Sequence, residues 1–205
     1  MNIFDTIENN AIKNKYINNT AVTQITSANK IKAISYKELI DQSTKVSQLL
    51  LNLGIQSKDK IYISSSDSIN FITSFLGAIK VGVIPIPGNS ELPQNQTLHI
   101  LNDSSPSIIL SDKTLDINQL KFSCLLYTNR NWKKLLSDIK IKKIKSINAK
   151  NNQVAFLIYS SGTTGLPKAI IHQHAIIKNT YFLHKNILKL KTKDKIFTTS
   201  KLFFA

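Results

Sequence analysis

Residues 154–171 read Val-Ala-Phe-Leu-Ile-Tyr-Ser-Ser-Gly-Thr-Thr-Gly-Leu-Pro-Lys-Ala-Ile-Ile. The two ends of this stretch, residues 154–158 and 169–171, are apolar runs of the length of buried strands. The middle, residues 159–168, contains four Ser or Thr residues, two glycines and a lysine. The stretch therefore predicts a strand, a polar loop and a second strand.

A loop of this composition suits a polyanion. Glycine allows a positive φ, which lets several backbone N–H groups point toward one place. Serine and threonine hydroxyls donate to phosphate oxygens, and Lys168 adds a compact positive charge. The sequence thus favours a phosphate-binding loop, and the alternative is a solvated turn that closes a hairpin.

The spacing excludes the Walker loop, which has four residues between its glycines and a Gly-Lys-Ser/Thr ending that opens a helix. Here Gly162 and Gly165 are three apart, Pro167 precedes the lysine, and a strand is expected to follow.

The segment instead resembles the signature of the AMP-forming acyl- and aryl-CoA ligases, the superfamily that includes luciferases and peptide-synthetase adenylation domains. The match runs from Tyr159 through Lys168 to His172 and His174. Ala169 stands where the family usually has glycine. Alanine serves there if small size is enough, and costs stability if a positive φ is needed.

The resemblance implies a reaction and a set of site residues. A carboxylic acid attacks ATP to give an acyl-adenylate, and the thiol of coenzyme A or of a carrier protein then displaces AMP. Lys168 is the expected catalytic residue, and the ligand that holds Mg²⁺ lies outside this chain. The residues implied to line the phosphates, together with Lys168, are Ser160, Ser161, Gly162, Thr163, Thr164 and Gly165.

The end of the chain, residues 201–205, is similar to the benzoate-CoA ligase branch, in which this segment lines the acyl pocket. Phe203 and Phe204 are therefore the expected substrate-pocket residues, and an aromatic ring there can stack on an aryl carboxylate. A buried strand end, or a pocket for a short or branched fatty acid, fits the same residues.

The histidines give a weaker signal. His172 and His174 alone are a poor metal site, because no third ligand is near in the sequence. By resemblance, His174 helps to start the following helix and packs behind the loop. His99 and His184 are interpreted as ordinary helix residues, and no metal site is predicted.

The 205 residues carry a net charge of +15, with one arginine among 27 basic residues. Proteins that recognise nucleic acid rely on arginine, whose guanidinium makes bidentate hydrogen bonds to phosphates and bases. Lysines distributed along the whole chain therefore argue against that function. Binding to nucleic acid or to an anionic surface stays an alternative, as does a non-catalytic nucleotide-binding module.

The single cysteine, Cys124, allows no internal disulfide and is interpreted as a small core residue. Residues 1–10 have no signal-peptide pattern, and the longest apolar passage, residues 75–87, is too short to span a membrane. We expect a cytoplasmic protein.

Strand and helix patterns alternate along the chain. Strands are predicted at residues 60–64, 83–87, 107–110, 124–127 and 195–199, with a hairpin at 21–25 and 31–34. Helices are predicted from Ser35 to Gly54 and at residues 68–80, 91–102, 131–139 and 174–190. This order predicts an α/β fold with a mostly parallel sheet flanked by helices on both faces.

The predicted organisation is a first α/β portion (residues 1–139), a polar linker (140–152) and a phosphate-loop portion (153–205). The resemblance covers nearly the whole chain and implies an incomplete N-terminal portion of the large ligase domain. The small C-terminal domain is then absent. The sequence thus suggests a truncated ligase that is inactive alone.

Overall fold

The computed structural model describes residues 2–26, 30–113, 115–161, 165–191 and 193–203. Its centre is a four-stranded parallel sheet in the order β4-β3-β5-β6. The strands are β3 (Lys60–Ser64), β4 (Ile84–Pro87), β5 (Ile108–Ser111) and β6 (Leu125–Tyr127). The prediction of a parallel sheet is confirmed.

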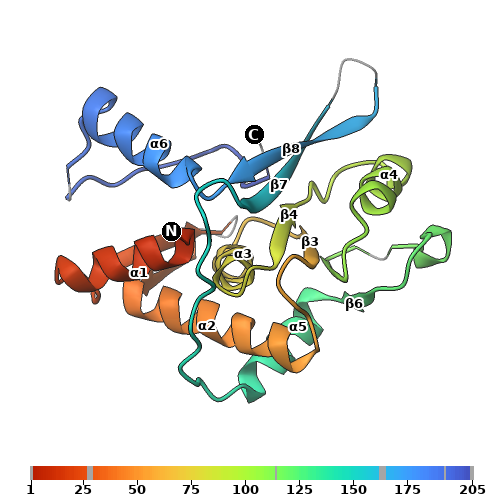
Figure 1. Ribbon diagram of the computed structural model, residues 1–205, viewed down its shortest axis with the longest axis horizontal. Coiled ribbons are helices and arrows are strands. Elements are labelled where there is room, and N and C mark those ends of the chain that lie inside the picture. Colours follow the sequence, from red (N-terminus) through yellow and green to blue (C-terminus); the bar gives the residue numbers. More distant parts are fainter. Residues whose placement is uncertain (1, 27–29, 114, 162–164, 192, 204–205) are drawn as a thin grey trace.

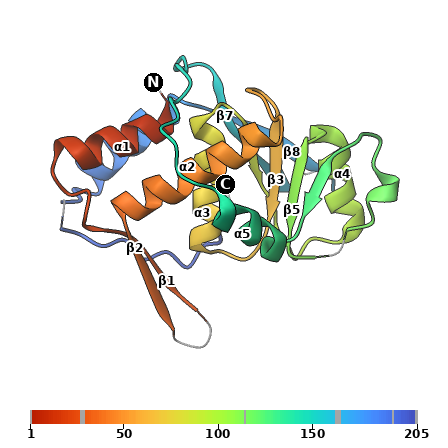
Figure 2. The ribbon, with the colours of Figure 1, turned by 90° about the horizontal axis from the view of Figure 1, so that it is seen from below.

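Alternate residues of the strands face two different layers of helices, as the pleat of a strand requires. Ile61 and Ile63 point into a core with α2 (Tyr36–Asn52), α3 (Ile69–Lys80) and α5 (Asn129–Asp138). Tyr62 points the other way, toward α4 (Gln94–Ser104). Figure 2 shows the sheet between these two layers, so the predicted covering on both faces is confirmed.

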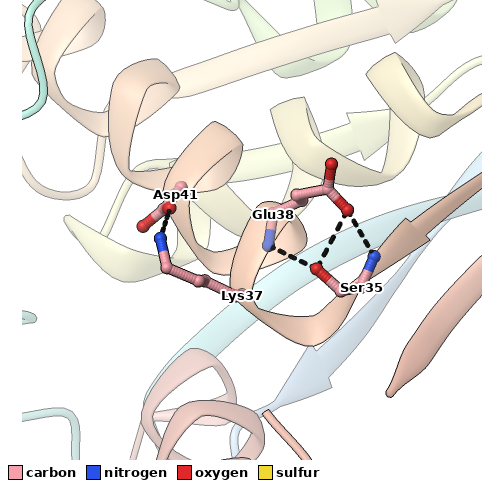
Figure 3. A network of polar contacts seen from close by, with 4 residues as sticks. All are labelled: Ser35, Lys37, Glu38 and Asp41. Atoms are coloured by element: carbon pink, nitrogen blue, oxygen red, sulfur yellow. Dashed lines mark hydrogen bonds and ion pairs between the residues drawn. The ribbon is translucent and has the colours of Figure 1, made fainter. Parts of the chain in front are cut away.

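The sequence around α2 shows how local chemistry sets a helix boundary. Ser35 Oγ accepts from the backbone N–H of Glu38, and the Glu38 carboxylate accepts from the N–H of Ser35 (Figure 3). This capping box satisfies N–H groups that the first turn leaves free. Just past the other end, Gly54 adopts a φ of +78°, which favours glycine. Both predicted boundaries of this helix are confirmed.

The N-terminal segment differs from expectation. No helix or strand is predicted for residues 1–10, but Ile3–Lys13 form α1, which buries Ile3, Phe4 and Ala11. Asn2 caps this helix by accepting from the N–H of Phe4. The predicted hairpin follows as β1 (Thr20–Ile25) and β2 (Ile31–Ser35), and a 3-10 turn, η1, spans Ile117–Gln119.

Of the two elements predicted near the C-terminus, the helix is confirmed and the strand is wrong. The helix predicted at residues 174–190 has narrower bounds, as α6 (Ile176–Phe182) followed by a π-helical turn, η2 (Leu183–Ile187). Residues 195–199 form no strand. Ile196 and Phe197 are 67% and 78% exposed. An apolar run forms a strand only when it pairs with neighbouring strands and its side chains pack against a core.

Residues 140–152 contain no helix or strand, as expected for a linker, yet they pack against the first portion. The N–H of Ile147 donates to the carbonyl of Lys80, and Ala149 is buried. The division of the chain at this segment stays a prediction. Among the described residues, no helix is long and apolar enough to cross a membrane.

Candidate phosphate-binding hairpin

The signature residues lie in an antiparallel hairpin formed by β7 (Val154–Ser161) and β8 (Pro167–Gln173). Both strands flanking the loop are confirmed. The loop itself is shorter than the predicted 159–168, since Ser160 pairs with Lys168 and Ser161 with Pro167. Antiparallel pairing satisfies backbone N–H and C=O groups, and this favours extension of the ladder. Of the described residues in the loop, Gly165 and Leu166 lie outside the ladder.

Gly165 gives this turn its special backbone. Its φ is +84°, and a side chain added there would meet no atom within 4 Å. Glycine is therefore used for its conformation and not for lack of space. The predicted phosphate ligands Gly162, Thr163 and Thr164 lie outside the described residues.

Lys168 extends from β8 into solvent. Lys37–Asp41 is the only ion pair among the residues that the structure describes, so no described carboxylate neutralises the Lys168 ammonium. Ser160, directly opposite Lys168 in the ladder, is half-buried. Cross-strand partners share one face of a hairpin, which brings these two predicted site residues together.

Ala169 answers the question raised by the missing glycine. It lies in the middle of β8, paired with Tyr159, and its φ is not in the left-handed region. Any residue adopts such an extended backbone, so alanine is compatible with the fold here.

Several contacts fix the hairpin to the rest of the molecule. The ring of Phe156 packs edge-on against Phe75 of α3, at a centroid distance of 5.2 Å. Leu157 joins the apolar cluster between β3 and α4. On the outer side, the Tyr159 hydroxyl donates to Asp103 Oδ2 at 2.5 Å. The His99 Nε2 lies 3.1 Å from the carbonyl oxygen of Pro167.

His99 and Asp103 are not among the site residues that the sequence predicts, and His99 is interpreted there as an ordinary helix residue. Their spacing of four residues on α4 is the signal that could have revealed a shared face. The strand that this face meets, however, lies more than 50 residues further along the chain.

His174 has a different role from the one predicted. The first turn of α6 has Ala175 at its N-cap and no side-chain cap, so His174 does not start that helix. Instead its buried Nδ1 accepts from the N–H of Ile3 at 3.3 Å. Burial lowers the pKa of His174, which agrees with a neutral ring that accepts a hydrogen bond.

The neighbouring His172 stacks on Phe156 at a centroid distance of 4.5 Å. Burial also lowers the pKa of this imidazole. Its Nε2 atom is buried without a hydrogen-bond partner. In the described part of the chain, no group of three His, Cys, Asp or Glu residues could hold a metal ion.

The predicted substrate pocket is only partly described. Phe203 is half-buried, and Phe204 lies outside the described residues. The N–H of Leu202 donates to Asp67 Oδ1 at 3.1 Å, and its side chain packs against the core of α2, α3 and α5. The role of Phe203 and Phe204 in binding an acid stays a prediction.

Cys124 is half-buried among apolar residues, as expected, and burial raises the pKa of its thiol.

The parallel sheet flanked by helices defines the molecule as an α/β protein, and its β7–β8 hairpin carries the glycine- and hydroxyl-rich candidate loop. The AMP-binding enzyme family matches residues 8–205, and the chain belongs to this family, the superfamily of adenylate-forming ligases. The resemblance suggested by residues 159–174 is confirmed.

Individual relatives agree with this assignment. The benzoate–CoA ligase of Thauera aromatica is 31% identical over 174 residues, which cover 78% of this chain and 32% of that ligase. Bacitracin synthase 3 of Bacillus licheniformis is 28% identical over 163 residues, which cover 78% of this chain and 2% of the synthase.

A solved structure shows the same fold. The anthranilate CoA ligase AuaEII in complex with anthranoyl-AMP matches with a TM-score of 0.88 at 24% identity, over 100% of this chain and 40% of that one. The chain thus spans about a third of the length of the curated CoA ligases it matches.

Proposed function

We propose that this chain is the N-terminal portion of a ligase that activates a carboxylic acid with ATP. In this reaction, a carboxylate oxygen forms a bond to the α-phosphorus, and the bond to the bridging oxygen breaks to release pyrophosphate. A thiol of coenzyme A or of a carrier protein then attacks the acyl carbon and AMP leaves. The exposed side chain of Lys168 in the β7–β8 hairpin, free of any described carboxylate, is the observation that supports this proposal.

The chemical task of the hairpin is to hold the β- and γ-phosphates and to take up the charge that the leaving pyrophosphate develops. Lys168 supplies the cation. The hydroxyls of Ser160, Ser161, Thr163 and Thr164 supply donors, and Gly162 and Gly165 allow the backbone to approach. Among the described residues no three His, Cys, Asp or Glu side chains form a cluster that could hold a metal ion, and no residue is assigned to Mg²⁺.

The proposed acid is an aryl carboxylate. The support is the similarity to the benzoate–CoA ligase of Thauera aromatica and the pair Phe203 and Phe204 at the predicted pocket. A cytoplasmic location likewise stays a prediction.

We further propose that residues 1–205 do not complete the reaction by themselves, because they span about a third of the related CoA ligases. The test is carboxylate-dependent exchange of labelled pyrophosphate into ATP by the purified 205-residue protein, with benzoate as the acid. We expect no exchange above background. Exchange that depends on benzoate would show that the chain is complete for adenylation.

The phosphate site is tested separately by titrating the protein with pyrophosphate and following backbone amide chemical shifts. We expect weak binding, in the millimolar range, with shifts confined to the β7–β8 hairpin. Lys168→Ala should weaken it about fivefold, because an ion pair exposed to solvent contributes up to about 1 kcal/mol. Lys150→Ala is the matched control. Lys150 is also an exposed lysine, but it precedes the start of β7, at the end of the hairpin away from the loop.

The same titration decides between this function and its alternatives. Micromolar binding of ATP without exchange would indicate a non-catalytic nucleotide-binding module. Shifts spread over the many surface lysines, and lost steeply with salt, would indicate a basic surface that binds polyanions without a site.

A further inference from the structure

Two side chains of α4 contact the β7–β8 hairpin on both of its strands. The His99 Nε2 lies 3.1 Å from the Pro167 carbonyl oxygen at the start of β8. Asp103, four residues later, accepts from the Tyr159 hydroxyl of β7 at 2.5 Å. Residues four apart lie above one another on a helix, so both contacts come from one face of α4. Figure 1 shows α4 beside the hairpin.

The chemistry of each contact is defined. A carbonyl oxygen only accepts, so His99 carries its proton on Nε2 and donates it. The Tyr159 hydroxyl donates to the carboxylate. Burial, reinforced by the bond to Asp103, raises the pKa of Tyr159, so the phenol remains a donor at neutral pH.

The register places these contacts next to the predicted site residues. Tyr159 precedes Ser160 on one strand, and Pro167 precedes Lys168 on the other. Successive side chains of a strand point to opposite faces. The side chain of Tyr159 lies on the face of the hairpin that contacts α4. The side chains of the paired residues Ser160 and Lys168 therefore lie on the opposite face.

The helix that makes these contacts is itself well anchored. Ile100 and Leu101 of α4 are buried, and they pack in one cluster with Tyr62 and Ile109 of the parallel sheet. Leu157 of β7 belongs to the same cluster. The position of α4, and through it that of the hairpin, is thus tied to the sheet.

We propose that His99 and Asp103 are positioning residues, which hold the facing ends of β7 and β8 so that Lys168 and Ser160 meet a phosphate in a fixed geometry. This inference rests on the proposed phosphate-binding function of the hairpin. Because binding by a mobile loop includes the cost of ordering it, fixing the base before the ligand arrives increases affinity.

The test uses two matched pairs of variants in the 205-residue protein. His99→Ala removes the donor, whereas His99→Gln keeps a side-chain N–H. Asp103→Ala removes the acceptor, whereas Asp103→Asn keeps an oxygen that accepts from Tyr159. The two measurements are the pyrophosphate dissociation constant from amide shifts and amide hydrogen exchange without ligand.

We expect each alanine variant to weaken pyrophosphate binding about threefold to tenfold, the range of one lost hydrogen bond. Amides of the β7–β8 ladder beside the two contacts, around Ser160 and Lys168, should exchange faster, while those of β3 and β5 stay unchanged. His99→Gln and Asp103→Asn should restore both properties to within about twofold. His184→Ala, on η2, serves as a control that changes neither.

Unchanged hairpin exchange in both alanine variants would overturn the inference. So would faster exchange to the same extent in β3 and β5, because that marks a general loss of stability. If pyrophosphate shifts no hairpin amide of the unmodified protein, the proposed function fails. In that case amide hydrogen exchange alone tests whether His99 and Asp103 hold the hairpin in place.

Discussion

The imidazole of His174 accepts a hydrogen bond from the backbone N–H of Ile3 at 3.3 Å, and so joins the residue after β8 to the first residue of α1. The histidine is 2% exposed. Its backbone N–H donates to the carbonyl of Gln153, the residue just before β7. One side chain thus connects the N-terminal helix to the base of the hairpin.

This contact predicts a loss of stability in mild acid. Burial lowers the pKa of His174 below its ordinary value of 6.5, partly opposed by Asp5. Below pH 6.5 the unfolded chain therefore binds more protons than the folded one, and the free energy of unfolding falls as the pH decreases. Above pH 6.5 the contribution of His174 is constant. Urea unfolding at pH values from 5 to 8 measures the slope.

His174→Gln should flatten this slope below pH 6.5, because glutamine does not titrate. Part of the slope should remain, since burial also lowers the pKa of His172. His184→Gln is the control and should leave the pH profile unchanged. A slope in His174→Gln equal to that of the unmodified protein would mean that protonation of His174 does not disturb the fold.

A second prediction concerns the contact of α2 with α3. A Cβ atom on Gly77 would clash with the backbone oxygen of Ser43 and would lie 2.6 Å from Cβ of Val46. Neither neighbour is the flexible end of a side chain, so the helices must separate. Gly77→Ala should lower the free energy of unfolding by about 1–3 kcal/mol, although alanine is the better helix former.

Gly54→Ala provides the comparison for Gly77→Ala. Gly54 has open space around it, but its φ is +78°. Its replacement should cost about 1 kcal/mol through backbone strain alone. Thermal unfolding of both variants separates the effect of packing from the effect of conformation. The steric argument fails if Gly77→Ala is as stable as the unmodified protein.

Local signals in the sequence predicted much of this fold. The capping box of Ser35 and Glu38 set the start of α2, and the alternation of strands and helices set the parallel sheet. The sequence did not reveal that Ser161 and Pro167 would pair and shorten the loop. That pairing depends on the register between two strands, and register is a property of the folded hairpin.

The same limit explains the missed helix and the missed site residues. The side chains of Ile3 and Phe4 stabilise α1 through a core that also contains residues of α2, α3 and β7. His99 and Asp103 meet a strand distant in sequence. Conversely, residues 195–199 had a strand pattern but received no partner strand. Tertiary packing, and not local propensity, decided each of these cases.

A third prediction follows from the extended backbone of Ala169. Because this position pairs with Tyr159 in β8, the glycine usual in the family would gain no conformational advantage here. Ala169→Gly should instead lower the free energy of unfolding by about 0.5–1 kcal/mol, the entropic cost of glycine in a strand. Urea denaturation measures this change, and a rise in stability would contradict the assigned backbone.

The fourth prediction concerns the buried contact of α5 with α3, in which Trp132 Nε1 donates to Ser74 Oγ at 3.1 Å. Both residues are completely buried. Ser74→Ala leaves the indole N–H without a partner and should lower the free energy of unfolding by about 1–3 kcal/mol.

Trp132→Phe removes the donor and part of the ring, so it also has a packing cost. The double variant removes donor and acceptor together and leaves no unpaired indole N–H. Its loss should therefore be smaller than the sum of the two single losses. Strict additivity in the double-mutant cycle would show that the hydrogen bond does not couple α5 to α3, and that Trp132 stabilises the core by its apolar area alone.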